Sequence, residues 1–171
     1  MLVPLFLTPE AEEPHVVFTK RRGDLRRHAG EISFPGGRRD PEDSDLAETA
    51  LREAEEEIGL PRRQVSLLWE LPLTSTFATN YVIHPFVGLI PAGLAWQLSA
   101  NEVEEVLELA LPALRAGRTR TRLTRRGITF ETDAYLVDEH LIWGATARIL
   151  ENLLARLEDA DLRSGARRTG A

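Results

Sequence analysis

The feature of this sequence that most restricts its fold is an acidic segment with helical periodicity, which runs from about residue 43 to Ile58. Apolar side chains recur there every three or four residues, so the segment is expected to form one amphipathic helix. Three glutamates, Glu53, Glu56 and Glu57, follow the spacing i, i+3 and i+4 and therefore fall on one side of that helix. That side borders the apolar stripe, so the carboxylates are expected at the edge of the buried face.

Both ends of this helix carry recognisable signals. Asp43 or Ser44 is a suitable N-cap, and Gly59 stands where a C-cap glycine is expected. Within the helix, Arg52 lies one turn from both Glu48 and Glu56, so its guanidinium is placed to reach either one and orient the ligand carboxylates.

The repulsion among the three glutamates points to a bound cation. Like charges at this spacing destabilise an exposed helix by about 0.2–0.5 kcal/mol per pair, and a divalent ion would offset that repulsion. The chain has no cysteine and no cluster of histidines, so the ligands would be carboxylate oxygens, which favour Mg²⁺ or Mn²⁺. A solvated glutamate-rich helix without a metal is the alternative interpretation of this segment taken alone.

Composition excludes several classes of protein. The chain has 171 residues with 43% hydrophobic and 28% charged residues, which suits one globular domain; we expect it to span residues 1–160, followed by a frayed tail over 161–171. No apolar run is long enough to cross a membrane, and no signal peptide is visible. The absence of cysteine excludes disulfides and thiolate chemistry and fits a cytoplasmic protein. A net charge of −6 argues against a general nucleic-acid binder.

The order of the charges is more informative than their sum. Residues 20–39 carry seven basic and two acidic side chains, whereas residues 40–57 carry nine acidic side chains and one arginine. Adjacent basic and acidic blocks suit a protein that holds both an anion and a divalent metal, and two solvated faces of opposite sign are the alternative. Six arginines between 115 and 126 are expected on a solvated hairpin, with a contribution to polyanion binding as the alternative.

The remaining elements are mostly strands. Periodicity and turn signals predict a second amphipathic helix at 144–159 and a short helical turn at 112–117. Strands are expected at 2–7, 16–19, 31–34, 64–73, 80–90, 103–109, 118–123 and 128–137, the last two as a hairpin. This order predicts an α/β fold, an α/β/α sandwich with a mixed β-sheet between helices.

A basic loop precedes the acidic helix. It runs from Thr19 to Gly37 and ends in the dipeptide Gly36-Gly37, whose backbone can approach a ligand closely. Cationic side chains followed by such a turn form a plausible clamp for a polyphosphate.

The segment 37–60 resembles the Nudix box. The second half of that pattern is matched at Arg52, Glu53, Glu56, Glu57, Gly59 and Leu60. The first half contains one residue more than the general pattern, and Ser44 stands at its early glutamate position, with Asp43 and Asp45 as the nearest acids.

The basic loop resembles the motif that precedes the box in coenzyme A pyrophosphatases of the Nudix family. The longer box spacing is similar to that subfamily as well, and residues 142–150 resemble the start of its C-terminal helix. The matching positions in the loop are Thr19, Arg21, Arg26, Gly30, Phe34, Pro35, Gly36 and Gly37.

The resemblance implies Mg²⁺- or Mn²⁺-dependent hydrolysis of the pyrophosphate of coenzyme A and its thioesters, giving 3′,5′-ADP and 4′-phosphopantetheine. It implies a small-molecule substrate, no nucleic acid and no membrane, and leaves the oligomeric state open. Glu53, Glu56 and Glu57 would be metal ligands, with Arg52 in the catalytic set. The expected substrate-binding residues are Arg21, Arg26, Arg27, His28, Phe34, Gly36 and Gly37.

The general base and the substrate stay open at this stage. The base is a box glutamate or a distal one; of the distal candidates we prefer Glu102, in an expected loop, over Glu105. NADH, ADP-ribose or a dinucleoside polyphosphate is the alternative substrate, although such enzymes do not need the arginine loop. A non-catalytic nucleotide-sensing domain is a further alternative, but such domains usually lose box glutamates.

Overall fold

A six-stranded mixed sheet forms the centre of the protein. The computed structural model describes residues 1–25, 29–76, 81–125 and 127–168, with the backbone alone for 161–168. The strands follow the order β3-β2-β1-β7-β4, with β8 paired to β2. β1 and β7 are parallel and the other pairs are antiparallel. The strands are β1 (Leu2–Leu7), β2 (Pro14–Arg21), β3 (Ile32–Ser33), β4 (Ser66–Glu70), β7 (Phe86–Leu89) and β8 (Val103–Ala110).

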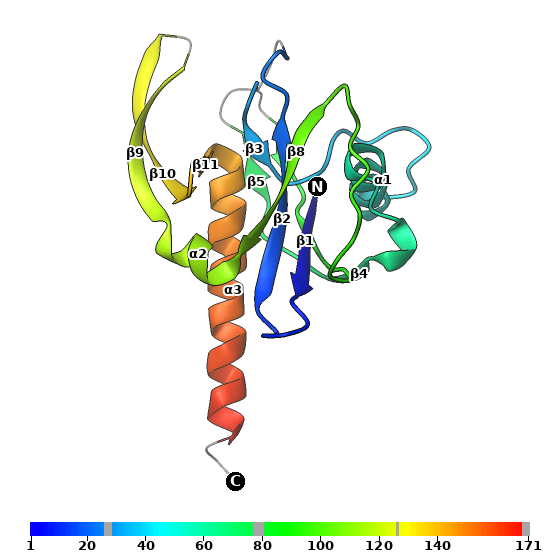
Figure 1. Ribbon diagram of the computed structural model, residues 1–171, viewed down its shortest axis with the longest axis vertical. Helices are drawn as coiled ribbons and strands as arrows, with labels where there is room; N and C mark the ends of the chain where they lie inside the picture. The colour runs from blue at the N-terminus through cyan, green and yellow to red at the C-terminus, as the bar shows by residue number, and fades with distance from the viewer. Residues whose placement is uncertain (26–28, 77–80, 126, 169–171) are drawn as a thin grey trace.

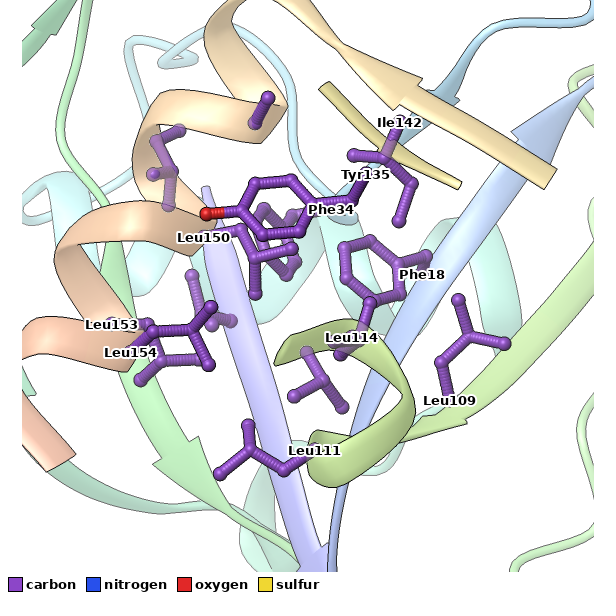
Figure 2. Packing of buried hydrophobic residues seen from close by; sticks show 14 of the residues in the cluster. Phe18, Phe34, Leu109, Leu111, Leu114, Tyr135, Ile142, Leu150, Leu153 and Leu154 are labelled. Carbon is purple, nitrogen blue, oxygen red and sulfur yellow. The ribbon is translucent and has the colours of Figure 1, made fainter. Parts of the chain in front are cut away.

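Helices cover both faces of this sheet, as the sequence predicted (Figure 1). Alternate residues of β1 serve the two faces: Leu2 packs with helix α1 (Leu46–Ile58), and Val3 packs with the cluster that includes Leu150. Leu150 belongs to helix α3 (Gly144–Arg168), which shares its face with the short helix α2 (Leu111–Ala116). Figure 2 shows the phenyl rings and leucines of this second core.

Two smaller sheets flank the central one. The predicted hairpin is confirmed as β9 (Arg118–Arg125) and β10 (Ile128–Val137), joined by a third strand, β11 (His140–Trp143), that was not predicted. The strand expected at 80–90 is wrong as one element, because Pro85 offers no backbone N–H and separates β6 (Val82–Ile83) from β7. β6 pairs with β5 (Thr74–Ser75), and a 3₁₀ turn (Arg62–Gln64) precedes β4.

The ends of α1 fix the position of the acidic side chains. Gly59 is the C-cap, as expected, with φ 68°, and its N–H donates to carbonyls of the last turn. The N-cap is Asp45, whose carboxylate accepts from the Glu48 N–H at 2.8 Å. The expected caps Asp43 and Ser44 are therefore wrong, and the Asp43 side chain serves another purpose described below.

Helix α3 is longer than the sequence suggested. It continues past the predicted end at 159 as far as Arg168, and its last turns extend beyond the body of the domain (Figure 1). The backbone of the expected frayed tail is thus helical through residue 168, because alanine, leucine and arginine in this stretch favour helix. Among the described residues, no helix is long and apolar enough to cross a membrane.

Candidate active site

The three box glutamates project from the last two turns of α1 and differ in their exposure to solvent. Glu57 is buried, with 6% of the residue exposed. The Glu53 side chain is 17% exposed and that of Glu56 is 61% exposed. The expectation that these carboxylates border the buried face of the helix is therefore confirmed for Glu53 and Glu57, of which Glu57 lies deeper, whereas Glu56 is exposed.

The Gly36-Gly37 turn lies directly against these carboxylates. The Gly36 N–H donates to Glu57 Oε2 at 3.2 Å. A Cβ on Gly37 would overlap the Glu53 carboxylate, and a Cβ on Gly36 would lie 2.6 Å from Met1 Cα. The backbone of this turn thus lies close to the Glu53 side chain and to Met1, and its approach to a ligand stays a prediction.

Arg52 holds the acidic side chains from one side. Its guanidinium donates to Glu53 Oε1 at 2.9 Å and to Glu56 Oε2 at 3.0 Å. It also donates to the Arg38 carbonyl at 3.0 Å and to both oxygens of Asp43, at 3.0 and 3.2 Å. The predicted orienting role of Arg52 toward Glu56 therefore has a matching contact.

Asp43 is a residue that sequence reasoning did not place in the site. Its side chain is 3% exposed and also accepts from the Thr49 hydroxyl at 2.8 Å and the Asp40 N–H at 2.9 Å. Hydrogen bonds from Arg52 hold the pKa of Asp43 well below its usual range, and Asp43 raises the pKa of Arg52. No periodic signal links two residues nine positions apart across a helix start, so only the fold reveals this pair.

The buried carboxylates carry an excess of negative charge. Burial raises the pKa of Glu57 to about 7; Glu53 and Glu102 add to the rise, and the Gly36 N–H and Arg21 oppose it. Burial also raises the pKa of Glu53, against hydrogen bonding from Arg52. The neighbouring cations therefore do not fully offset the charge of Glu53 and Glu57, and such an excess of negative charge suits the binding of a cation.

Of the two distal candidates, Glu102 lies near this cluster. It precedes β8, contributes to the raised pKa of both Glu53 and Glu57, and has Oε2 3.8 Å from the Arg21 guanidinium. Glu105 lies on β8 opposite Lys20 and pairs with its ammonium at 3.5 Å. Glu102 thus lies within electrostatic range of Glu53 and Glu57, whereas Glu105 is paired with Lys20, so the distal glutamate preferred from the sequence stays the better candidate.

The carboxylates fit a hard divalent cation in their chemistry. Buried carboxylate oxygens with surplus negative charge are donors that Mg²⁺ and Mn²⁺ accept. Within the described part of the chain, however, no group of three or more acidic or histidine side chains is arranged to hold a metal. Arg52 hydrogen-bonds to both Glu53 and Glu56 in this structure.

Of the substrate-binding residues predicted in the basic loop, Arg21 lies at the site and Phe34 lies in the core. Arg21 lies beside the cluster, and its buried Nε has no hydrogen-bond partner among the described residues. Phe34 is 1% exposed and stacks on Phe18 at 4.6 Å between ring centroids. Phe34 is therefore a core residue that anchors the glycine turn, and its predicted contact with substrate is wrong. The predicted Arg26, Arg27 and His28 lie outside the described residues.

The hairpin arginines pair with acidic side chains, which accords with the expected solvated hairpin. Arg118 contacts Glu151 of α3 at 2.5 Å, and Arg122 contacts Glu131 across the hairpin at 3.2 Å. Arg125 reaches Glu31 at 3.5 Å. These arginines are occupied within the protein.

The pKa of Glu57 predicts a pH dependence of stability in metal-free protein. The pKa rises from 4.5 to about 7 on folding, so the folded state binds this proton more tightly than the unfolded state. Stability should therefore fall as pH rises from about 4.5 to about 7, by up to about 3 kcal/mol. Glu57→Gln stays neutral and should lack this loss.

Urea unfolding with a chelator at pH 5 and pH 7.5 measures the effect. The free energy of unfolding of Glu57→Gln minus that of the wild type should be larger at pH 7.5 than at pH 5, because only the wild type loses stability as pH rises. Equal differences at both pH values would show that Glu57 titrates as an ordinary exposed carboxyl.

Comparison with known proteins identifies the family. Residues 3–126 match the model of the NUDIX domain. A Photorhabdus laumondii protein named "Uncharacterized Nudix hydrolase NudL" is 37% identical over 161 residues, covering 92% of this chain and 83% of the relative. A protein of the same name from Yersinia enterocolitica is 38% identical over 156 residues, with 90% and 77% covered.

Solved structures share the fold. A MutT/nudix family protein from Enterococcus faecalis has a TM-score of 0.59 at 17% identity, covering 92% of this chain and 60% of that one. A Nudix hydrolase from M. smegmatis has a TM-score of 0.56 at 17% identity, covering 67% and 71%. With the box glutamates gathered at the edge of α1 and the family model matched over most of the chain, this protein belongs to the Nudix family.

Proposed function

We propose that this protein hydrolyses the pyrophosphate of coenzyme A and its thioesters to 3′,5′-ADP and 4′-phosphopantetheine or its acyl form. The observation that carries the proposal is the meeting of two segments. Arg21, from the loop that resembles the coenzyme A motif, lies 3.8 Å from Glu102. Both residues act electrostatically on Glu57, the buried glutamate of α1. Carboxylates for a metal and a cation for a phosphate are thereby next to each other.

The residues divide the chemistry of pyrophosphate hydrolysis. A divalent cation held by Glu53, Glu56 and Glu57 would neutralise phosphate charge and lower the pKa of a water molecule. Arg52 keeps Glu53 and Glu56 oriented, and Arg21 donates hydrogen bonds to phosphate oxygens. We assign to Glu102 the proton of the attacking water, because it acts electrostatically on Glu53 and Glu57 and is not one of the proposed metal ligands.

The number of cations favours coenzyme A over NADH and ADP-ribose. Coenzyme A carries a 3′-phosphate in addition to its pyrophosphate, so it presents more negative charge than NADH or ADP-ribose. The basic loop supplies more arginines than a pyrophosphate alone requires, and we assign Arg26, Arg27 and His28 to that extra phosphate.

A catalytic function is also better supported than nucleotide sensing. All three box glutamates are present, and Glu57 is held in a buried position by the Gly36 N–H. A buried carboxyl with a pKa raised to about 7 destabilises the folded protein at neutral pH unless a bound cation offsets its charge. Retention of such a group suits metal-dependent hydrolysis.

A substrate panel tests the proposal. Purified protein with Mg²⁺ or Mn²⁺ should hydrolyse coenzyme A with a higher kcat/KM than NADH, ADP-ribose, a dinucleoside polyphosphate or a dNTP. Chromatography of the products should show 3′,5′-ADP and 4′-phosphopantetheine in equal amounts. Faster turnover of any other substrate would refute the assignment of coenzyme A, and no turnover of any would refute hydrolysis.

The contact between Gly37 and Glu53 predicts the effect of one methyl group. Gly37→Ala places a Cβ in the space of the Glu53 carboxylate, which is the end of a flexible side chain and is able to move away. Stability should change by less than about 1 kcal/mol, whereas kcat should fall about 10²-fold because a metal ligand is displaced.

Gly23→Ala is the matched control for this variant. A Cβ at Gly23 meets Glu104 Oε2 only at 4.0 Å, which is ordinary contact. The control should keep kcat within about twofold of the wild type. Equal activity of Gly37→Ala and Gly23→Ala would mean that Glu53 need not occupy its position against the turn.

A further inference from the structure

The turn that carries Glu102 is fastened to the basic loop by Arg22. The Arg22 N–H donates to the Glu102 carbonyl at 3.1 Å. The Arg22 guanidinium reaches the same turn, donating from Nη1 to the Ala100 carbonyl at 2.5 Å. Backbone and side chain of one residue thus hold both ends of the segment 100–102.

Asp24 orients the Arg22 guanidinium. Arg22 Nε donates to Asp24 Oδ1 at 2.9 Å and Nη2 to Oδ2 at 2.6 Å, which is a two-point contact. These hydrogen bonds lower the pKa of Asp24. Each guanidinium nitrogen of Arg22 therefore has a partner in the protein, which suits a structural link better than a substrate contact.

The other side of the turn rests on α1 itself. The Ser99 N–H donates to the Glu57 carbonyl at 2.9 Å, and the Ser99 carbonyl accepts from the N–H groups of Glu102 and Val103, both at 3.0 Å. The turn is thus fixed to the metal-site helix at Ser99 and to the basic loop at Arg22. Loss of either anchor would let the Glu102 carboxylate move relative to Glu53 and Glu57.

We propose that Arg22, oriented by Asp24, is a positioning residue that holds Glu102 at the box glutamates. Its catalytic consequence rests on the proposed hydrolase function, in which Glu102 is the base. A hollow of about 450 Å³ lined by Arg22, Gly23, Asp24, Ala100, Val103 and Glu104 lies beside this link. Direct binding of substrate by Arg22 in that hollow is the competing role.

A double-mutant cycle separates the two roles. Arg22→Ala should lower kcat for coenzyme A about tenfold with KM within about twofold, because the base is misplaced while the substrate site is intact. In a Glu102→Gln background, Arg22→Ala should lower kcat less than about twofold further. A tenfold loss that persists in that background, an effect confined to KM, or no loss in the wild-type background would overturn the proposal.

Arg62→Ala is the control for losing an exposed, doubly paired arginine. Arg62 contacts Glu48 at 2.6 Å and Glu55 at 2.8 Å, away from the Glu102 turn, and its removal should leave kcat within about twofold. Asp24→Asn keeps one acceptor for Arg22 and should lower kcat less than Arg22→Ala.

Amide hydrogen exchange without substrate tests the link independently of the reaction. Arg22→Ala should raise exchange at the amides of Glu102 and Val103 at least about fivefold, whereas Arg62→Ala should not. If the protein hydrolyses no substrate and this increase is still seen, the hydrolase proposal fails and the anchoring stands. Unchanged exchange in Arg22→Ala refutes the anchoring whatever the activity.

Discussion

The site depends on the partly buried guanidinium of Arg52. This one cation is in contact with Asp43 at the end of the loop, with the Arg38 carbonyl within the loop, and with Glu53 and Glu56 on the helix. Removing one partner of a buried ion pair typically destabilises a protein by about 3–5 kcal/mol, because a charge is left uncompensated. Arg52 thereby ties the loop that carries the glycine turn to the helix that carries the acidic side chains.

The same contacts leave the deepest carboxylate without a cation of its own. The hydrogen bond from the Gly36 N–H is the main contribution that lowers the pKa of Glu57, and Arg21 adds a smaller one, whereas burial, Glu53 and Glu102 raise it. The excess of acidic residues that gives the net charge of −6 is concentrated around α1, since nine of them fall between residues 40 and 57. A divalent ion at this edge of α1 would supply the positive charge that Arg52, which already contacts five other residues, does not.

Local sequence signals predict the helix that carries the glutamates, whereas the caps and contacts around it depend on residues that are distant in the sequence. Helix α1 was predictable from its periodicity and from Gly59. Its N-cap was not, because three adjacent residues, 43–45, all have suitable side chains. Arg52 and Thr49 bind the Asp43 carboxylate, which leaves Asp45 as the cap. The motif around Phe34 indicates ligand binding, yet stacking on a ring from β2 makes it a core residue. The loop position of Glu102 was expected from the sequence, whereas the pairing of Glu105 with Lys20 depends on the register between β8 and β2, which no single sequence displays.

Calorimetric titration of Mn²⁺ tests most directly the proposed carboxylate metal site at the buried edge of α1. Glu57→Gln should weaken binding at least about tenfold relative to the wild type. Glu55→Gln removes a neighbouring glutamate that is paired with Arg62 on the exposed side, and should leave the Mn²⁺ affinity within about twofold. Equal affinity of the wild type and Glu57→Gln, or no binding by the wild type, would contradict the claim.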